Sequence, residues 1–183
     1  MSERPRAGLL PLYLKLYDDT SPDARTKGEG FVGEVEKALV ARGLEVERAP
    51  GCRLEPEFAS AVSDLEKYGV DAIVTLHLAY SPSEESVGPL SETYLPVVIL
   101  DTTPDAEFGR DVDPARIMYN HGIHGVQDMA NMLRRRGKRY EIVAGHWQES
   151  DVLDRCADLV RAAWAATRFG STRALRIGEA FKG

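Results

Sequence analysis

The sequence predicts a three-layer α/β/α fold, flavodoxin-like or Rossmann-like, built on a mostly parallel sheet of five or six strands. Short apolar runs alternate along the chain with longer amphipathic segments, an order that favours helices on both faces of a parallel sheet. Several strand candidates are nearly continuous in apolar residues, as expected of strands covered on both faces. Each is followed by a segment that can form a crossover. We expect residues 1–183 to form one domain.

The first half of the chain contains three predicted strands and two predicted helices. The strands cover residues 8–17, 44–48 and 71–78. Residues 18–29 are polar, and Ser21-Pro22-Asp23 is a helix-start or turn signal. Each helix is recognised by an apolar stripe and a closing glycine. These sets are Val32, Val35 and Leu39 with Gly43, then Phe58, Val62 and Leu65 with Gly69.

The second half continues the alternation less regularly. Residues 80–92 are rich in Ser, Pro, Glu and Gly and predict a loop or a short, poor helix. Strands are predicted at 95–100 and 140–144. After the first of them, which ends at Asp101-Thr102-Thr103-Pro104, about 15 polar and irregular residues run to Met118, a length that suggests a function or a contact. A helix with Val126, Met129 and Leu133 on one face follows. A last helix should start at an Asp151 cap and close at Gly170, and 174–177 is a candidate sixth strand.

Composition argues against several classes of function. Lys and Arg number 23 against 29 Asp and Glu, a net charge of −6, whereas proteins that bind nucleic acid need a basic surface. No apolar run approaches the roughly 20 residues that span a bilayer, and the N-terminus lacks the pattern of a signal peptide. Two cysteines, Cys52 and Cys156, are too few for a disulfide scaffold. We therefore expect a cytoplasmic protein with no nucleic-acid or membrane partner.

The segment 119–148 carries most of the functional signal. Three of the four histidines lie there, His121, His124 and His146, together with Asn, Gln and Asp residues and loop glycines. Such groups are costly to bury without partners, which favours a polar site. The alternative is structural, with one histidine at a helix cap and another satisfied in the core. In open α/β sheets ligands bind beyond the carboxyl ends of the strands, where five predicted segments converge: 17–19, His77, 101–103, 120–128 and 145–147.

Common catalytic motifs are missing from this predicted edge. No Gly-x-Gly-x-x-Gly follows the first strand, and neither a P-loop nor a Gly-x-Ser-x-Gly elbow occurs. A flavodoxin-like redox role is disfavoured because Asp18-Asp19 would repel a flavin phosphate. His121, His124 and Asp128 resemble a partial metal set. We expect no metal site within this chain, because the two histidines flank Gly122 in a predicted loop and no further ligand is adjacent in sequence.

One part of the sequence is similar to a known family. Asn120-x-x-x-His124-Gly125, then a helix, then Val143-Ala144-Gly145-His146-Trp147-Gln148 resembles the N-terminal domain of the L-arabinose isomerase and L-fucose isomerase superfamily. The stretch 120–135 is most similar to the fucose-isomerase-like branch. The resemblance spans about 8–182 and is specific only between 119 and 148.

The resemblance implies the N-terminal domain of a metal-dependent aldose–ketose isomerase that acts on L-fucose-like or L-arabinose-like sugars. Mn2+ would be expected in the full-length enzyme, held by residues of later domains that would follow residue 183. No catalytic residue is then expected in this chain. The domain would help to close a sugar pocket in a homo-oligomer. Its substrate-binding candidates are His124, by motif, and then Asn120, Gln127, His146 and Trp147.

Two departures from the family pattern bear on the substrate. Arabinose isomerases carry Gln two residues before a Leu-Tyr pair, but Leu14 stands there, ahead of Leu16-Tyr17. They also place Gln where this chain has His121. L-Arabinose itself is therefore in question as the substrate. The alternative function is a stand-alone sugar-binding or assembly domain that kept the fold without the catalysis.

Overall fold

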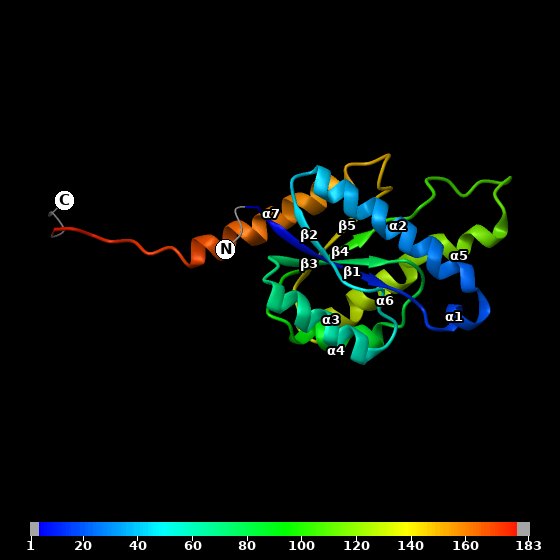
Figure 1. Cartoon of the computed structure of the whole chain (residues 1–183), viewed down its shortest axis with the longest axis horizontal. Helices are drawn as coiled ribbons and strands as arrows, with labels where there is room; N and C mark the ends of the chain where they lie inside the picture. The colour runs from blue at the N-terminus through cyan, green and yellow to red at the C-terminus, as the bar shows by residue number, and fades with distance from the viewer. Residues whose placement is uncertain (1–3, 179–183) are drawn as a thin grey trace.

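A computed structural model describes residues 4–178 and contains one five-stranded sheet with the order β2-β1-β3-β4-β5. The strands are β1 (Arg6–Leu12), β2 (Glu45–Arg48), β3 (Ala72–His77), β4 (Val97–Asp101) and β5 (Tyr140–Ala144). Every neighbouring pair is parallel. The predicted parallel α/β/α fold is confirmed, with five strands (Figure 1).

Helices cover both faces of this sheet (Figure 1). One face carries α2 (Pro22–Ala41) and α7 (Val152–Gly170), and the other carries α3 (Glu55–Tyr68), α4 (Ser83–Glu92) and α6 (Gly122–Arg135). Three short elements lie at the carboxyl end of the strands: α1 (Leu16–Thr20), the 3-10 turn η1 (Pro114–Arg116) and α5 (Ile117–Asn120). None of the helices within residues 4–178 is long and apolar enough to cross a membrane.

Alternation along the strands divides the buried side chains into two cores. Leu9 and Val74 face α2 and α7, whereas their neighbours Leu10 and Ile73 face α3, α4 and α6. Successive side chains of a strand point to opposite faces, so a strand must be apolar throughout to serve both cores. That requirement explains the nearly continuous apolar runs of β1, β3 and β4 in the sequence.

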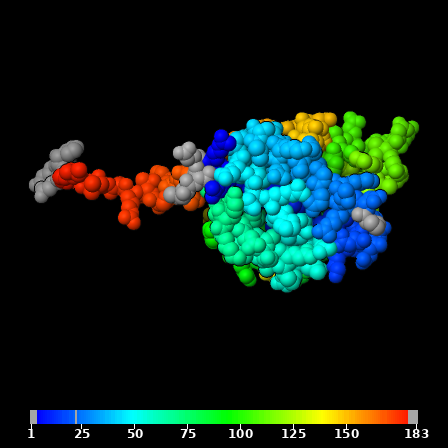
Figure 2. All heavy atoms as spheres, in the orientation of Figure 1, coloured from blue at the N-terminus to red at the C-terminus, as the bar shows by residue number. Residues whose placement is uncertain are grey.

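Several predicted elements need correction. β1 ends at Leu12, and Tyr17 lies in helix α1 rather than in the strand, because the chain leaves the sheet after Leu12. The predicted sixth strand at 174–177 is wrong: this segment lies beyond α7, away from any strand edge (Figures 1 and 2), and Leu175 and Ile177 are 86% and 91% exposed. Residues 1–3 and 179–183 lie outside the described residues, and with them the C-terminal end of the stretch 8–182 that resembles the family.

The helix ends also differ in detail from the predictions. Residues 83–92, left open between loop and helix, form α4 with Pro89 inside it. His121 precedes α6 and His124 lies in its first turn, so the two do not flank a loop glycine. At the start of α7 the Asp151 carboxylate pairs with Arg155, and the hydroxyl of Ser150 accepts the Val152 N–H instead. Gly170 is the last helical residue rather than a cap beyond it.

Candidate functional site

The candidate site is the carboxyl edge of the sheet. With the strand order 2-1-3-4-5, the direction of the crossovers changes between β1 and β3, which is where ligands bind in open α/β sheets. The chain segments that follow β1, β3, β4 and β5 all reach this edge, as the sequence predicts. It carries two groups of polar side chains, one around His77 and Tyr17 and the other around Asp105.

The first turn of α6 packs directly on His77 at the end of β3. A Cβ atom at Gly122 would lie 2.6 Å from the His77 carbonyl oxygen, and one at Gly125 would lie 2.6 Å from Cδ2 of the His77 ring. Real Cβ atoms do not approach so closely, so only glycine allows the helix to sit this near to the strand end. The two glycines, one helical turn apart, therefore set the position of His121 and His124 at the edge.

His77 is buried as a neutral side chain. Burial lowers the pKa of its imidazole to about 3, because a charged ring is poorly solvated there. Among the described residues neither ring nitrogen has a hydrogen-bond partner, and the same holds for the hydroxyls of Tyr13, Thr75 and Ser81. Buried polar atoms are normally paired with protein or water.

Tyr17, His121 and His124 are the other side chains of the polar group around His77. The Tyr17 hydroxyl and His121 Nε2 lie 3.0 Å apart and form a hydrogen bond. The rings of His121 and His124 have centroids 6.2 Å apart, and His124 Nδ1 lies 3.2 Å from the His121 carbonyl oxygen. Burial, and next the nearby His124, lower the pKa of His121. The lowered pKa favours the neutral form of His121. His124 is exposed.

The second group surrounds Asp105 in the long segment after β4. Arg116 Nε donates to Asp105 Oδ2 over 2.8 Å, and a second guanidinium nitrogen pairs with Oδ1. Asn120 Nδ2 donates to the same carboxylate at 2.7 Å, and Asn120 Oδ1 accepts the Asp105 N–H. The Arg116 hydrogen bonds hold the pKa of Asp105 below its usual value. This clamp orders a segment that the sequence presents only as irregular and polar.

The three remaining predicted site residues, His146, Trp147 and Gln127, lie in three different environments. His146 Nε2 lies 3.4 Å from the Pro104 carbonyl oxygen and lines, with Gln148, an open depression beside Asp105. The Trp147 ring packs edge-on against Phe31 at 6.0 Å, so it contributes to the core boundary. Gln127 is exposed on α6.

The structure thus joins some of the sequence candidates and separates others. Asn120 and His146 both contact residues 104–105, whereas His124 belongs with His121 and Tyr17. Within residues 4–178 no hydrogen bond or ring contact links His124 directly to His146. Sequence reasoning did not identify Arg116 or Asp105, because their pairing depends on how an irregular segment folds back. The glycine pair at 122 and 125 was a readable sign of close packing.

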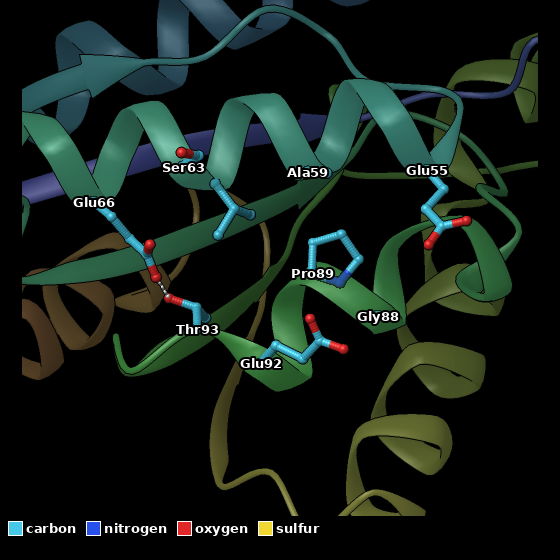
Figure 3. A pocket seen from close by; sticks show the side chains of 9 residues that line it. Glu55, Ala59, Ser63, Glu66, Gly88, Pro89, Glu92 and Thr93 are labelled. Atoms are coloured by element: carbon cyan, nitrogen blue, oxygen red, sulfur yellow. Dashed lines mark hydrogen bonds between the residues drawn. The ribbon is translucent and has the colours of Figure 1, made fainter.

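A different cavity lies away from this edge, between α3 and α4 (Figure 3). Its volume is about 270 Å³, and Glu55 stands near one end while Glu66 accepts a hydrogen bond from Thr93 at the other. Pro89 and Ala59 lie between them. The carboxylates here have no basic counterpart in the lining, and the groove shares no residue with the two polar groups.

The described residues contain no group of three or more His, Cys, Asp or Glu side chains arranged to hold a metal ion. His121 Nε2 is bonded to Tyr17, and Asp105 is committed to Arg116 and Asn120. These atoms are therefore already engaged within the protein.

These features define a doubly wound α/β domain with a polar carboxyl edge and no phosphate loop, a class that places ligands at that edge. Residues 55–171 match the family described as the L-arabinose isomerase N-terminal domain, and the chain belongs to this family. The match includes β3, α6, β5 and most of the candidate site.

Individual relatives agree with the family match. The chain is 28% identical over 112 residues to the L-arabinose isomerase of Geobacillus kaustophilus (strain HTA426), and the aligned region covers 58% of this chain and 22% of that protein. It is 30% identical over 111 residues to the L-arabinose isomerase of Shewanella sp. (strain ANA-3), covering 60% and 22%. The chain thus matches about a fifth of the length of these relatives.

Among solved structures, the capsular polysaccharide assembling protein CapF from Staphylococcus aureus is similar at 16% identity, with 85% of this chain and 41% of that chain covered. The TM-score is 0.38, and this likeness supports no functional comparison.

Proposed function

We propose that this chain is the sugar-pocket and oligomer-contact domain of an aldose–ketose isomerase that acts on L-arabinose-like or L-fucose-like sugars. The observation that carries the proposal is the position of His124: it lies in the segment matched by the family and at the edge where this fold class binds ligands. Later domains of the same protein and other subunits would complete the pocket. We also propose a cytoplasmic location, in keeping with two buried, free thiols.

The chemistry of the edge supports a hydroxyl-rich ligand. A neutral imidazole both donates and accepts a hydrogen bond, which matches a sugar hydroxyl. The first turn of α6 also has backbone N–H groups without helical partners, next to His124. No lysine or arginine belongs to the group formed by Tyr17, His121 and His124, so a neutral ligand fits it better than an anion.

Such isomerases use a divalent cation, expected to be Mn2+ in the full-length enzyme, which would polarise sugar oxygens and so favour proton transfer between adjacent carbons. The described residues do not fit that ion, for the reasons given above. We therefore assign no step of the isomerisation to this chain. Its proposed part is to bind and orient sugar hydroxyls.

The test is a titration of the 183-residue chain with L-arabinose and L-fucose, followed by the amide shifts of 15N-labelled protein. We expect shifts confined to residues 121–127 and to α1, because His124 contacts His121 and His121 contacts Tyr17 of α1. His124→Ala should reduce them strongly. Lys67→Ala, on the exposed surface of α3, is the matched control and should leave them unchanged.

Two results would count against the proposal. One is an absence of shifts near His124 at high millimolar sugar, and the other is an equal effect of both variants. Replacement of the aligned histidine by alanine in a full-length relative should also weaken turnover while metal content stays unchanged. If sugar binds as expected but that turnover does not change, the alternative of a stand-alone sugar-binding domain is favoured.

A further inference from the structure

A second cavity at the carboxyl edge lies between α2 and the segment 104–119. Its volume is about 220 Å³. The α2 wall is formed by Lys27, Gly28 and Phe31, and the opposite wall by Leu78, Pro104, Arg116 and Tyr119. α2 and α5 lie side by side at this end of the molecule (Figure 1). None of the five substrate-binding candidates from the sequence lines it.

Two cations are held against one aromatic ring in this cavity. Lys27 Nζ lies 5.1 Å from the centroid of the Tyr119 ring and 3.3 Å from its hydroxyl, and Arg116 Cζ lies 5.9 Å from the same centroid. Cation–π contacts hold both groups near the ring. The two cations differ in their partners: Arg116 pairs with the Asp105 carboxylate, whereas Lys27 contacts the tyrosine.

Lys27 is the uncompensated charge. Within residues 4–178 it forms no ion pair with any carboxylate, although the chain carries a net charge of −6. Its partner is the neutral Tyr119 hydroxyl. A local excess of positive charge attracts small anions. An anion in this cavity would pair with Lys27, which lines it.

The remaining walls limit the size and shape of the ligand. Phe31, Leu78 and Pro104 are apolar, and Tyr119 offers a ring face, so one side of the ligand must tolerate carbon contacts. Pockets for drug-sized ligands usually begin near 300 Å³, and this cavity is smaller. A single pyranose or furanose ring fits this volume, whereas a dinucleotide does not.

We infer that this cavity binds a monosaccharide-sized anion, a sugar acid or a sugar phosphate, with its charged group on Lys27 and Arg116 and its ring against Tyr119 and Phe31. The inference stands on the cavity and does not rest on the proposed isomerase role. The neutral site at His124 and this cationic cavity are then two binding sites on one edge, each with its own ligand chemistry.

Trp147 provides a readout of occupancy, since its ring packs at 6.0 Å from Phe31. Trp164→Phe leaves Trp147 as the single tryptophan, and its fluorescence can be followed at low ionic strength. The probes are D-arabinose 5-phosphate, D-gluconate, inorganic phosphate and neutral L-arabinose. We expect a saturable change with the sugar phosphate or the sugar acid, and whichever binds more tightly identifies the charged group. L-Arabinose should bind at least about tenfold more weakly, the equivalent of about 1.4 kcal/mol.

Three variants locate the site. Lys27→Gln removes the unpaired cation and should weaken anion binding about tenfold or more. Gly28→Leu fills the cavity, because a Cβ at Gly28 already lies 3.3 Å from Leu78 Cδ1, and should abolish binding. Lys37→Gln, on the same helix but paired with Glu34 at the surface, is the control and should bind like the parent.

The inference is overturned if neither sugar anion changes the Trp147 signal, if L-arabinose binds as tightly as the anions, or if Lys37→Gln weakens binding as much as Lys27→Gln. Inorganic phosphate that binds as tightly as both sugar anions would also overturn it, because the ring would then contribute nothing. Sugar binding at His124 is measured separately by the amide shifts of residues 121–127. Failure of one site is therefore distinguishable from failure of the other.

Discussion

Because His77 is buried, the free energy of unfolding of this protein should depend on pH near the usual pKa of histidine. Most carboxylates do not titrate in that range. Burial lowers the pKa of His77 from 6.5 to about 3, so the unfolded chain takes up the proton first as the pH falls. Stability is fully present above pH 6.5 and declines below it. Between pH 7 and pH 5 the expected loss is about 2 kcal/mol, since each pKa unit corresponds to about 1.4 kcal/mol.

The matching perturbation is His77→Leu, which removes two ring nitrogens without partners among the described residues. Replacing an unsatisfied buried polar group by an apolar one of similar size is nearly neutral or stabilising. We expect similar or greater stability at pH 7, and a loss between pH 7 and pH 5 that is about 2 kcal/mol smaller than in the parent.

Urea denaturation at both pH values, followed by circular dichroism, measures this difference. His121 also has a lowered pKa and contributes in the same direction, so a His121→Gln variant measures the remaining slope. Asp105 and Glu57 have lowered pKa values as well, but their contribution is lost at more acidic pH. An unchanged pH slope in His77→Leu would refute the assignment of a neutral, buried imidazole.

Three further predictions concern the same edge. Gly122→Ala should destabilise the fold by about 1–3 kcal/mol, because its Cβ would meet the His77 carbonyl oxygen at 2.6 Å. The control Gly30→Ala, in mid-helix with open space around it, should be neutral or up to about 1 kcal/mol stabilising. Thermal melts compare the two variants, and equal effects would contradict the close approach of α6 to His77. Asp105→Asn should speed hydrogen exchange in residues 102–120 because it weakens the Arg116 pairing, and unchanged exchange there would count against the clamp. The 183-residue chain with added Mn2+ should not interconvert L-arabinose, L-fucose or D-arabinose with their ketoses, and chelator-sensitive conversion would show that prediction wrong.

The sequence by itself predicts most of the fold because the relevant signals are local. Apolar runs such as 71–78 reflect strands that serve two cores, and the glycine at position 69 marks the end of a helix. The prediction of a sixth strand at 174–177 is wrong, because this apolar segment has no neighbouring strand with which to pair. Strand formation depends on a neighbour as well as on propensity, and the pattern carries no information about that neighbour.

The sequence likewise places the functional signal in residues 119–148, because the histidines and amides are visible there together. Only the tertiary structure decides how these residues are grouped. His121, which lies against His124, joins Tyr17 from a distant helix, and Asn120 joins Asp105 across an irregular segment. The cationic cavity brings Lys27 to Arg116 from opposite halves of the chain. Contacts between residues far apart in sequence arise from chain topology and side-chain packing, so residue spacing alone does not reveal them.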